Sequence, residues 1–256
     1  MTRPLTADAR AALVARLASA GFVAAEEEAD ELLACGGDLE PLVARRLTGE
    51  PLAWITGSVR FCGLDLEVHP GVYVPRWQSE ALARRAAARL PTKGTAIDVC
   101  TGCGAIAAVL RAAHPAARVV ATDADPRAVA CAIVNGVDAR LGDLFGPLTP
   151  VEADVVVAVV PYVPTSELAL LQRDTLAFES PRSYDGGQDG LGILRRVVAA
   201  SPQFLRRGSA LLLELGGAQA EALRVDLRAS GFGAIEVIVD EDGDIRGVEA
   251  TLATAR

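Results

Sequence analysis

The sequence predicts an α/β protein with a doubly wound, mainly parallel sheet and a small helical domain before it. From Thr95 onward, strand-like and helix-like segments alternate, which is typical of parallel strands joined by crossover helices. The strand-like segments are continuous apolar runs, as expected of strands that are covered on both faces. Near the end of the chain, two of these segments are separated only by Glu241–Asp244, and so short a connection requires an antiparallel pair.

The expected elements of this part of the chain follow from apolar runs and from helical spacing. The strands are expected at Thr95–Cys100, Arg118–Thr122, Asp154–Val160, Ala210–Glu214, Ala234–Val239 and Val248–Thr254. The helices are expected at Ala105–Ala113, Pro126–Asn135 and Ala218–Ala229.

The first quarter of the chain has a different pattern. Three short amphipathic helices are expected at residues 8–20, Ala24–Ala34 and Glu40–Leu47. A region punctuated by Gly and Pro follows, in which Phe61–Val68 alternates between apolar and polar residues and favours a β-hairpin linker. We therefore expect three parts, at residues 1–55, 56–76 and 77–256.

Composition excludes several classes of protein. Of the 256 residues 51% are hydrophobic, which excludes a disordered chain, and the net charge of −8 argues against nucleic acid as a partner. No apolar run approaches the roughly 20 residues of a membrane-spanning helix, and no signal peptide is visible. Five cysteines, an odd number, favour reduced thiols and hence a cytoplasmic protein. The sequence predicts no oligomeric state.

A glycine-rich loop follows the first strand of the sheet. Gly102 and Gly104 flank Cys103 just before a helix, where glycine lets a ligand approach the backbone and the helix start offers free N–H groups. Asp123 closes the next strand, where a carboxylate can accept hydrogen bonds from ribose hydroxyls. This order of strand, loop, helix and acid predicts an adenosine-containing cofactor.

Two cofactors fit this loop. Gly102, Gly104 and Ala107 match the relaxed fingerprint of NAD-binding proteins. Asp98, however, ends the strand beside the loop, where a carboxylate would repel a pyrophosphate but could hold the ammonium group of S-adenosylmethionine. The terminal antiparallel pair also suits the methyltransferase version of the sheet, so the sequence favours S-adenosylmethionine over NAD.

Cys100 and Cys103 have the spacing of a redox or zinc motif. No second cysteine pair is present to complete a zinc site, so we expect two small residues in a tight loop and no metal.

Several segments, in the same order along the chain, resemble the HemK/PrmC family, whose members methylate the side-chain amide of a glutamine in bacterial release factors. The segments that carry the resemblance are Leu42–Leu52, Phe61–Leu64, His69–Arg76, Asp98–Ile106, Gly142–Phe145 and Asp185–Leu191. The resemblance implies a Rossmann-like class I methyltransferase with a seven-stranded sheet. It also implies that the helical domain helps to hold a protein substrate, possibly a release factor.

The resemblance further implies the residues of the site. Cofactor contacts are expected from Asp98, Cys100, Thr101, Gly102, Cys103, Gly104, Asp123, Asp143, Leu144 and Val159. The acceptor group would be positioned by Val159, Val160, Pro161 and Tyr162.

This last segment departs from the family, which carries Asn-Pro-Pro-Tyr there. An amide nitrogen is a poor nucleophile, and the family's Asn oxygen and the next carbonyl accept its two N–H bonds. Val159 has no such acceptor, whereas the Val160 carbonyl remains. Loss of one buried hydrogen bond costs about 1–3 kcal/mol, or roughly 5- to 150-fold in rate.

A second departure is Trp77, in a loop where the family carries proline. It can be a packing residue where two parts of the chain join, or part of a reshaped acceptor pocket. Three functions therefore stay open: a glutamine methyltransferase of the release-factor type, a methyltransferase with another protein or small-molecule acceptor, and a cofactor-binding relative without catalysis.

Overall fold

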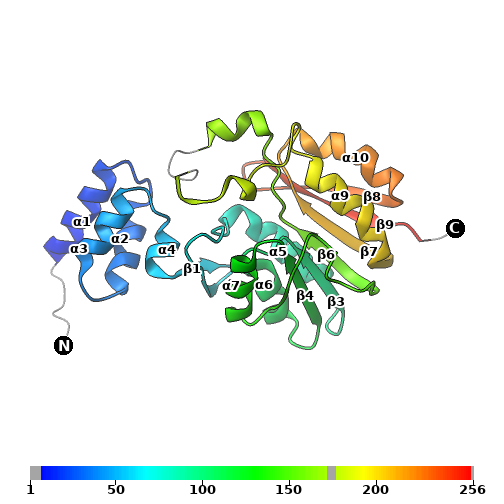
Figure 1. Ribbon diagram of the computed structural model, residues 1–256, viewed down its shortest axis with the longest axis horizontal. Coiled ribbons are helices and arrows are strands. Elements are labelled where there is room, and N and C mark those ends of the chain that lie inside the picture. Colours follow the sequence, from blue (N-terminus) through cyan, green and yellow to red (C-terminus); the bar gives the residue numbers. More distant parts are fainter. Residues whose placement is uncertain (1–6, 172–176, 255–256) are drawn as a thin grey trace.

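A computed structural model describes residues 7–171 and 177–254 of the chain. It has two parts, a small group of helices and a larger sheet with helices on both faces (Figure 1). The helices are α1 (Ala7–Ser19), α2 (Ala25–Ala34), α3 (Leu39–Leu47), α4 (Leu52–Thr56), α5 (Glu80–Arg89), α6 (Ala105–Ala113), α7 (Pro126–Val134), α9 (Gly192–Ala200) and α10 (Gln219–Ala229). The strands are β1 (Ser58–Phe61), β2 (Leu64–Glu67), β3 (Thr95–Val99), β4 (Arg118–Asp123), β5 (Asp138–Leu141), β6 (Ala153–Ala158), β7 (Leu205–Glu214), β8 (Phe232–Val239) and β9 (Ile245–Leu252).

Helices α1 to α4 pack around a core of their own at one end of the molecule (Figure 1). Leu17, Leu32 and Val43 are fully buried there. Arg46 joins this core because its guanidinium pairs with Glu28, at 2.6 Å, and stacks over the ring of Phe22. A buried arginine is tolerated only with such partners.

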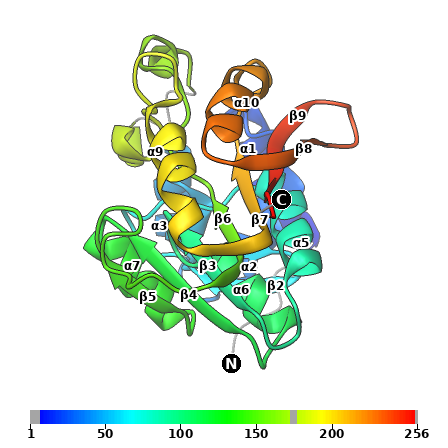
Figure 2. The same ribbon diagram turned by 90° about the vertical axis from the view of Figure 1, so that its right-hand side faces the viewer.

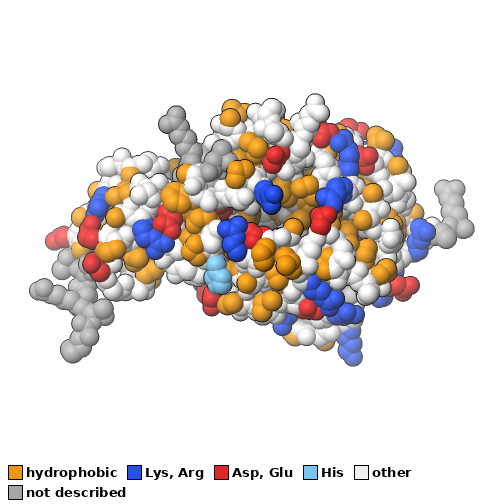
Figure 3. Space-filling view, in the orientation of Figure 1, with side chains coloured by type: hydrophobic (Ala, Val, Ile, Leu, Met, Phe, Trp, Pro, Cys, Tyr) orange, Lys and Arg blue, Asp and Glu red, His pale blue; other side chains and the backbone are white. Residues whose placement is uncertain are grey.

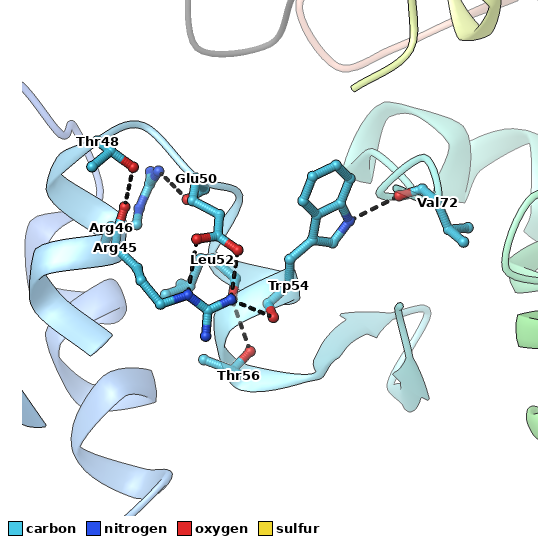
Figure 4. Close-up of polar contacts among 8 residues, drawn as sticks. All are labelled: Arg45, Arg46, Thr48, Glu50, Leu52, Trp54, Thr56 and Val72. Carbon is cyan, nitrogen blue, oxygen red and sulfur yellow. Dashed lines mark hydrogen bonds and ion pairs between the residues drawn. The ribbon is translucent and has the colours of Figure 1, made fainter. Parts of the chain in front are cut away.

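The join between the helical group and the rest of the chain is held by polar contacts (Figure 4). Arg45 donates two hydrogen bonds to the Glu50 carboxylate, and Arg46 donates one to the Glu50 carbonyl at 3.0 Å. The indole of Trp54 donates to the carbonyl of Val72 at 2.9 Å, beyond the β1–β2 hairpin. These contacts fix the direction in which the chain leaves the helices.

The hairpin forms, but its turn lies inside the alternating run. β1 and β2 pair antiparallel, and Cys62 and Gly63 make the turn with positive φ angles of 49° and 80°. The run Phe61–Val68 alternates on both sides of this turn, so periodicity alone does not locate it.

The predicted sheet is confirmed. Its seven strands follow the order β5-β4-β3-β6-β7-β9-β8, and all neighbours are parallel except the pairs that include β9. Alternate strand residues enter two separate cores, one under α5, α6 and α7 and the other under α9 and α10 (Figure 2). This is why the strand sequences show continuous apolar runs.

Three elements of the sheet domain have no counterpart in the expectation. α5 consists mainly of alanine and arginine, which leaves a weak apolar stripe although Leu82 and Ala86 are buried. β5 has only four residues and lies at the sheet edge. α9 begins directly after a glycine-rich segment, without a side-chain cap. Short or weakly patterned elements depend on tertiary packing more than on local sequence.

The segment after β6 is folded back on itself through glycine. Gly186 donates its N–H to the carbonyl of Val163 at 2.9 Å, and a Cβ at this position would lie 2.5 Å from the Gly190 oxygen and 2.8 Å from that of Pro161. Both contacts are backbone atoms that cannot move aside.

We therefore predict that Gly186→Ala lowers the free energy of unfolding by about 2–3 kcal/mol, because of overpacking. The matched control is Gly187→Ala: its φ is +91°, but its Cβ would meet nothing within 4 Å, so only strain of about 1 kcal/mol is expected. Urea denaturation of both variants measures the difference. Equal losses of the free energy of unfolding in the two variants would contradict the conclusion that the backbone around Gly186 leaves no room for a side chain.

Candidate functional site

A cavity of about 1180 Å³ lies along the edge of the sheet at which the parallel strands end. Cys100, Asp123, Val159 and Glu214 each follow or end one of four neighbouring strands, and all four line this cavity. Ligands of open parallel sheets bind at this edge. On the face shown in Figure 3, basic and acidic side chains gather among hydrophobic ones near the middle of the molecule.

The structure brings together most of the residues that the sequence predicts for the site. The cavity is lined by Cys100, Gly102, Asp123, Asp143, Leu144, Val159, Val160, Pro161 and Tyr162. A small adjoining cavity is lined by Asp98, Thr101, Gly102 and Cys103, among others, whereas Gly104 lines neither.

Asp98 holds the glycine-rich loop in place. Its Oδ2 accepts hydrogen bonds from the Thr101 hydroxyl at 2.6 Å and from the Ala107 N–H at 3.1 Å, so it links the loop to the first turn of α6. The residue is 2% exposed, and this burial raises the pKa of its carboxyl from 3.8 to about 7.

The backbone of the loop takes up strained conformations. Gly102 and Gly104 have φ angles of +59° and +87°, and Cys100 has +59° although it is not glycine. Such a conformation costs a non-glycine residue on the order of 1 kcal/mol, and residues of this kind cluster at binding sites. A Cβ on Gly102 would meet nothing within 4 Å, so the backbone is open there to a ligand.

Asp123 closes the loop from the neighbouring strand. Its Oδ2 accepts the N–H of Gly102 at 2.9 Å, and its Oδ1 accepts that of Asp125 at the same distance. Burial raises the pKa of this carboxyl, although the backbone hydrogen bonds oppose the shift. Each oxygen keeps a second lone pair that can accept a hydrogen bond from a ligand.

The predicted adenine-side residues differ in their exposure. Asp143 is exposed and forms an ion pair with Arg196 of α9, a partner that the sequence does not indicate. Leu144 is buried, has a φ of +47°, belongs to the core under α9 and α10, and also lines the cavity.

The segment after β6 forms the other end of the cavity. The Tyr162 hydroxyl donates to Glu214 Oε1 at 3.1 Å, and the side-chain amide of Gln219 donates to the Tyr162 carbonyl at 2.8 Å. Val159 is half-buried, and its apolar side chain lines the same cavity as Cys100 and Tyr162.

Sequence reasoning missed a buried cluster beside this segment. The Glu179 carboxylate accepts the N–H of Val74 at 2.9 Å and also hydrogen bonds from Arg76 and the Tyr184 hydroxyl. The ring of Tyr73 packs edge-on against Tyr184. The cluster ties the chain around Glu179 to the segment between hairpin and sheet, and its members are too distant in sequence for a motif to reveal them.

Glu214 was also missed, although its signal is in the sequence. It is an acid at the end of a continuous apolar strand, which is the same signal that singles out Asp98 and Asp123.

Trp77 is not a packing residue. Its side chain is 66% exposed and lines the cavity beside Arg76 and Gln78. Its position is therefore in the wall of the cavity.

The cysteines of the loop are free thiols. Burial raises the pKa of Cys103 to about 12 and that of Cys100 still further, so neither is a ready thiolate. Among residues 7–171 and 177–254, no group of three or more His, Cys, Asp or Glu side chains could hold a metal ion. In the same residues, no helix is long and apolar enough to cross a membrane.

Comparison with known proteins defines the class. A family model described as "Methyltransferase small domain" matches residues 66–160. A methyltransferase from Pyrococcus furiosus shares the fold, with a TM-score of 0.55 and 19% identity over 82% of this chain and 98% of that one. A ribosomal protein L11 methylase from Lactobacillus delbrueckii gives a TM-score of 0.51 at 16% identity, over 73% and 84% of the two chains. The chain is an S-adenosylmethionine-dependent methyltransferase.

The sequence relatives identify the family. A release factor glutamine methyltransferase from Geobacter sulfurreducens is 39% identical over 209 residues, which are 79% of this chain and 72% of that protein. A protein of the same name from Cereibacter sphaeroides is 32% identical over 97% of this chain and 99% of its own length. The chain belongs to the release factor glutamine methyltransferase family. Of the two cofactors that the loop could fit, S-adenosylmethionine is thus the one that applies.

The raised pKa of Asp98 predicts how the stability of the protein depends on pH. The folded chain keeps a proton that the unfolded chain loses near pH 3.8, so stability contributed by this group falls as pH rises from about 4 to 7 and is constant above. Asp98→Asn keeps an acceptor oxygen and removes this titration. Relative to the natural chain, the variant should gain on the order of 4 kcal/mol across that interval, as measured by urea denaturation without cofactor. If the difference in the free energy of unfolding between the variant and the natural chain did not change with pH, the raised pKa of Asp98 would be refuted.

Proposed function

We propose that this protein transfers a methyl group from S-adenosylmethionine to the side-chain amide of a glutamine in a peptide chain release factor. One observation carries the proposal: 97% of the chain aligns, at 32% identity, with 99% of a relative named for this activity. The reaction needs a slot for a planar amide next to the cofactor, and the cavity between Val159 and Tyr162 offers one that is partly apolar.

We propose that the cofactor is held along the ends of β3 and β4. S-adenosylmethionine supplies an electrophilic methyl group on its sulfonium. Residues 100–104 would approach it with their backbone, and Asp98 would face its ammonium group. Asp123 would accept hydrogen bonds from the ribose hydroxyls, and Asp143 with Leu144 would lie at the adenine. The open backbone at Gly102 and the spare lone pairs of Asp123 support this placement.

The segment after β6 would position the acceptor amide. Val159 would lie beside the cofactor's methyl group and the amide, Val160 would offer its carbonyl to one N–H, and the rings of Pro161 and Tyr162 would pack against the amide plane. All four residues line the cavity, which supports these roles.

The helical group, residues 1–55 in our division, would bind part of the release factor. It packs around a separate core and is joined to the site by the contacts of Arg45, Arg46 and Trp54, so a protein held by it would have a fixed position relative to the cavity. The linker is placed at 56–76 and the methyltransferase domain at 77–256. Because release factors act on ribosomes, we expect the reaction in the cytoplasm.

Val159 and the exposed Trp77 favour a second candidate, a methyltransferase that acts on another protein or a small molecule. An apolar slot with an aromatic side chain at its mouth would suit an acceptor that is already nucleophilic and needs no amide-oriented hydrogen bonds.

The function is tested by incubating the purified protein with S-adenosylmethionine and with release factors from a bacterium. We expect one methyl group on one glutamine, located by mass spectrometry of peptides. Replacing that glutamine by asparagine in the release factor should abolish the modification, which is the control for site specificity. Methyl transfer to other substrates but to no release factor would favour the second candidate, and tight cofactor binding without any transfer would favour a non-catalytic relative.

The proposed contact of Asp123 with the ribose leads to a separate prediction, on the affinity for the cofactor. Asp123→Asn keeps the shape of the side chain but removes the charge and makes one oxygen position a donor. We expect cofactor binding to weaken by about 10-fold, since a hydrogen bond to a charged group contributes about 1.5–3 kcal/mol. Isothermal titration with S-adenosylmethionine measures this, and Asp125→Asn, on an acid that pairs with Arg127, is the matched control. An unchanged affinity for Asp123→Asn would remove Asp123 from the site.

A further inference from the structure

Glu214, the last residue of β7, has one carboxylate oxygen without a partner. The residue is 5% exposed, and its Oε2 is buried and makes no hydrogen bond to any described residue. Buried carboxylate oxygens are nearly always paired, because an unsatisfied one keeps the full cost of its lost hydration. The free oxygen therefore needs an explanation.

The other buried glutamates of the described chain show what is usual in this protein. Glu179 uses both oxygens, on Val74 N–H and on Arg76 and Tyr184. Glu249 is 6% exposed and pairs both oxygens with arginines, Oε2 with Arg85 and Oε1 with Arg89 at 3.0 Å.

Unlike Glu249, Glu214 lines the cavity. Of the three buried glutamates, Glu214 is thus the one with a free oxygen. Its other oxygen, Oε1, is held by Tyr162, a residue of the proposed acceptor slot.

Sheet register places Glu214 beside Val159. β6 and β7 are parallel with Ala158 opposite Leu213, so the next residues of the two strands, Val159 and Glu214, emerge side by side at the same edge. The Tyr162 hydroxyl donates to Oε1 at 3.1 Å and fixes the orientation of the carboxylate. The acceptor that β6 lacks at Val159 is therefore present on the adjacent strand.

We propose that Oε2 of Glu214 accepts an N–H of the glutamine amide, in place of an acceptor at position 159, and takes up the proton released on methylation. This inference rests on the proposed function. In the reaction the amide nitrogen forms a bond to the methyl carbon as the carbon–sulfur bond breaks, the electron pair of that bond stays on sulfur, and one N–H proton passes to Glu214. The second N–H points to the Val160 carbonyl, so both hydrogens of the amide have an acceptor.

The surroundings of Glu214 suit a proton acceptor. Burial raises the pKa of its carboxyl, and this outweighs the opposing effect of the bonded Tyr162 hydroxyl and of Arg246 on β9. The Ser79 hydroxyl is also nearby and opposes the shift, but its oxygen makes no hydrogen bond to Oε2 in the structure. Tyr73 is the further titratable group that faces Glu214, and burial raises the pKa of that phenol to about 12, so it stays neutral. A carboxylate of raised pKa holds a transferred proton better than an ordinary one.

The first test is Glu214→Gln, which keeps the size of the side chain but removes the charge and the proton acceptor. We expect kcat for release-factor methylation to fall on the order of 100-fold, with the Kd for S-adenosylmethionine within about twofold of the natural chain. Glu249→Gln is the matched control, since it changes an equally buried carboxylate outside the cavity and should leave kcat within about twofold. Glu214→Asp keeps the charge and should retain more activity than Glu214→Gln. The unchanged Kd for the cofactor shows that the Glu214→Gln variant is folded.

The second test asks whether Glu214 replaces an acceptor at position 159. Val159→Asn should restore kcat at least about 10-fold in the Glu214→Gln background, because it supplies an acceptor oxygen on the neighbouring strand end. A merely structural role of Glu214 predicts no such rescue. Release-factor methylation that persists within threefold in Glu214→Gln would overturn this inference and leave the proposed function intact. A natural chain that methylates no release factor would overturn both.

Discussion

The site depends on the parallel pairing of four strands that end at one edge of the sheet. Val99 of β3 lies opposite Thr122 of β4 and Ala158 of β6, and Ala158 lies opposite Leu213 of β7. Since the side chains along these strands are buried on both faces, a shift of register would move every one of them to the wrong core. The order of functional groups along the cavity is therefore fixed by the packing of the sheet.

This constraint also brings three acids to the same edge of the sheet, where they differ in burial and in role. Asp98 is satisfied by its own loop and by α6, and it shapes the cofactor loop. Asp123 is satisfied through backbone N–H groups and keeps lone pairs toward the cavity. Glu214 keeps a free oxygen. In our account, carboxylates at or near three strand ends thus give a scaffold group, a cofactor ligand and a substrate ligand, according to what each one faces.

Much of the fold could be predicted from the sequence, because continuous apolar strands, glycine turns and the terminal antiparallel pair are local patterns. The cofactor loop could be located for the same reason. What could not be predicted depends on contacts between distant segments. The ion pair of Asp143 with Arg196 and the cluster around Glu179 join residues more than 50 positions apart. The sequence pattern allows Trp77 to be a packing residue or part of a pocket, because the exposure of one tryptophan in a loop depends on the packing of distant segments.

In our account, Glu214 at the end of β7 accepts the amide N–H for which Val159, after β6, has no side-chain acceptor. This contact is tested most directly by a crystal structure of the protein with S-adenosylhomocysteine and a glutamine-containing segment of a release factor. Our account predicts the glutamine side-chain nitrogen within about 2.7–3.2 Å of Glu214 Oε2. A glutamine amide bound in the cavity with its N–H groups on other atoms, and with Glu214 turned away or bonded only to protein, would contradict it.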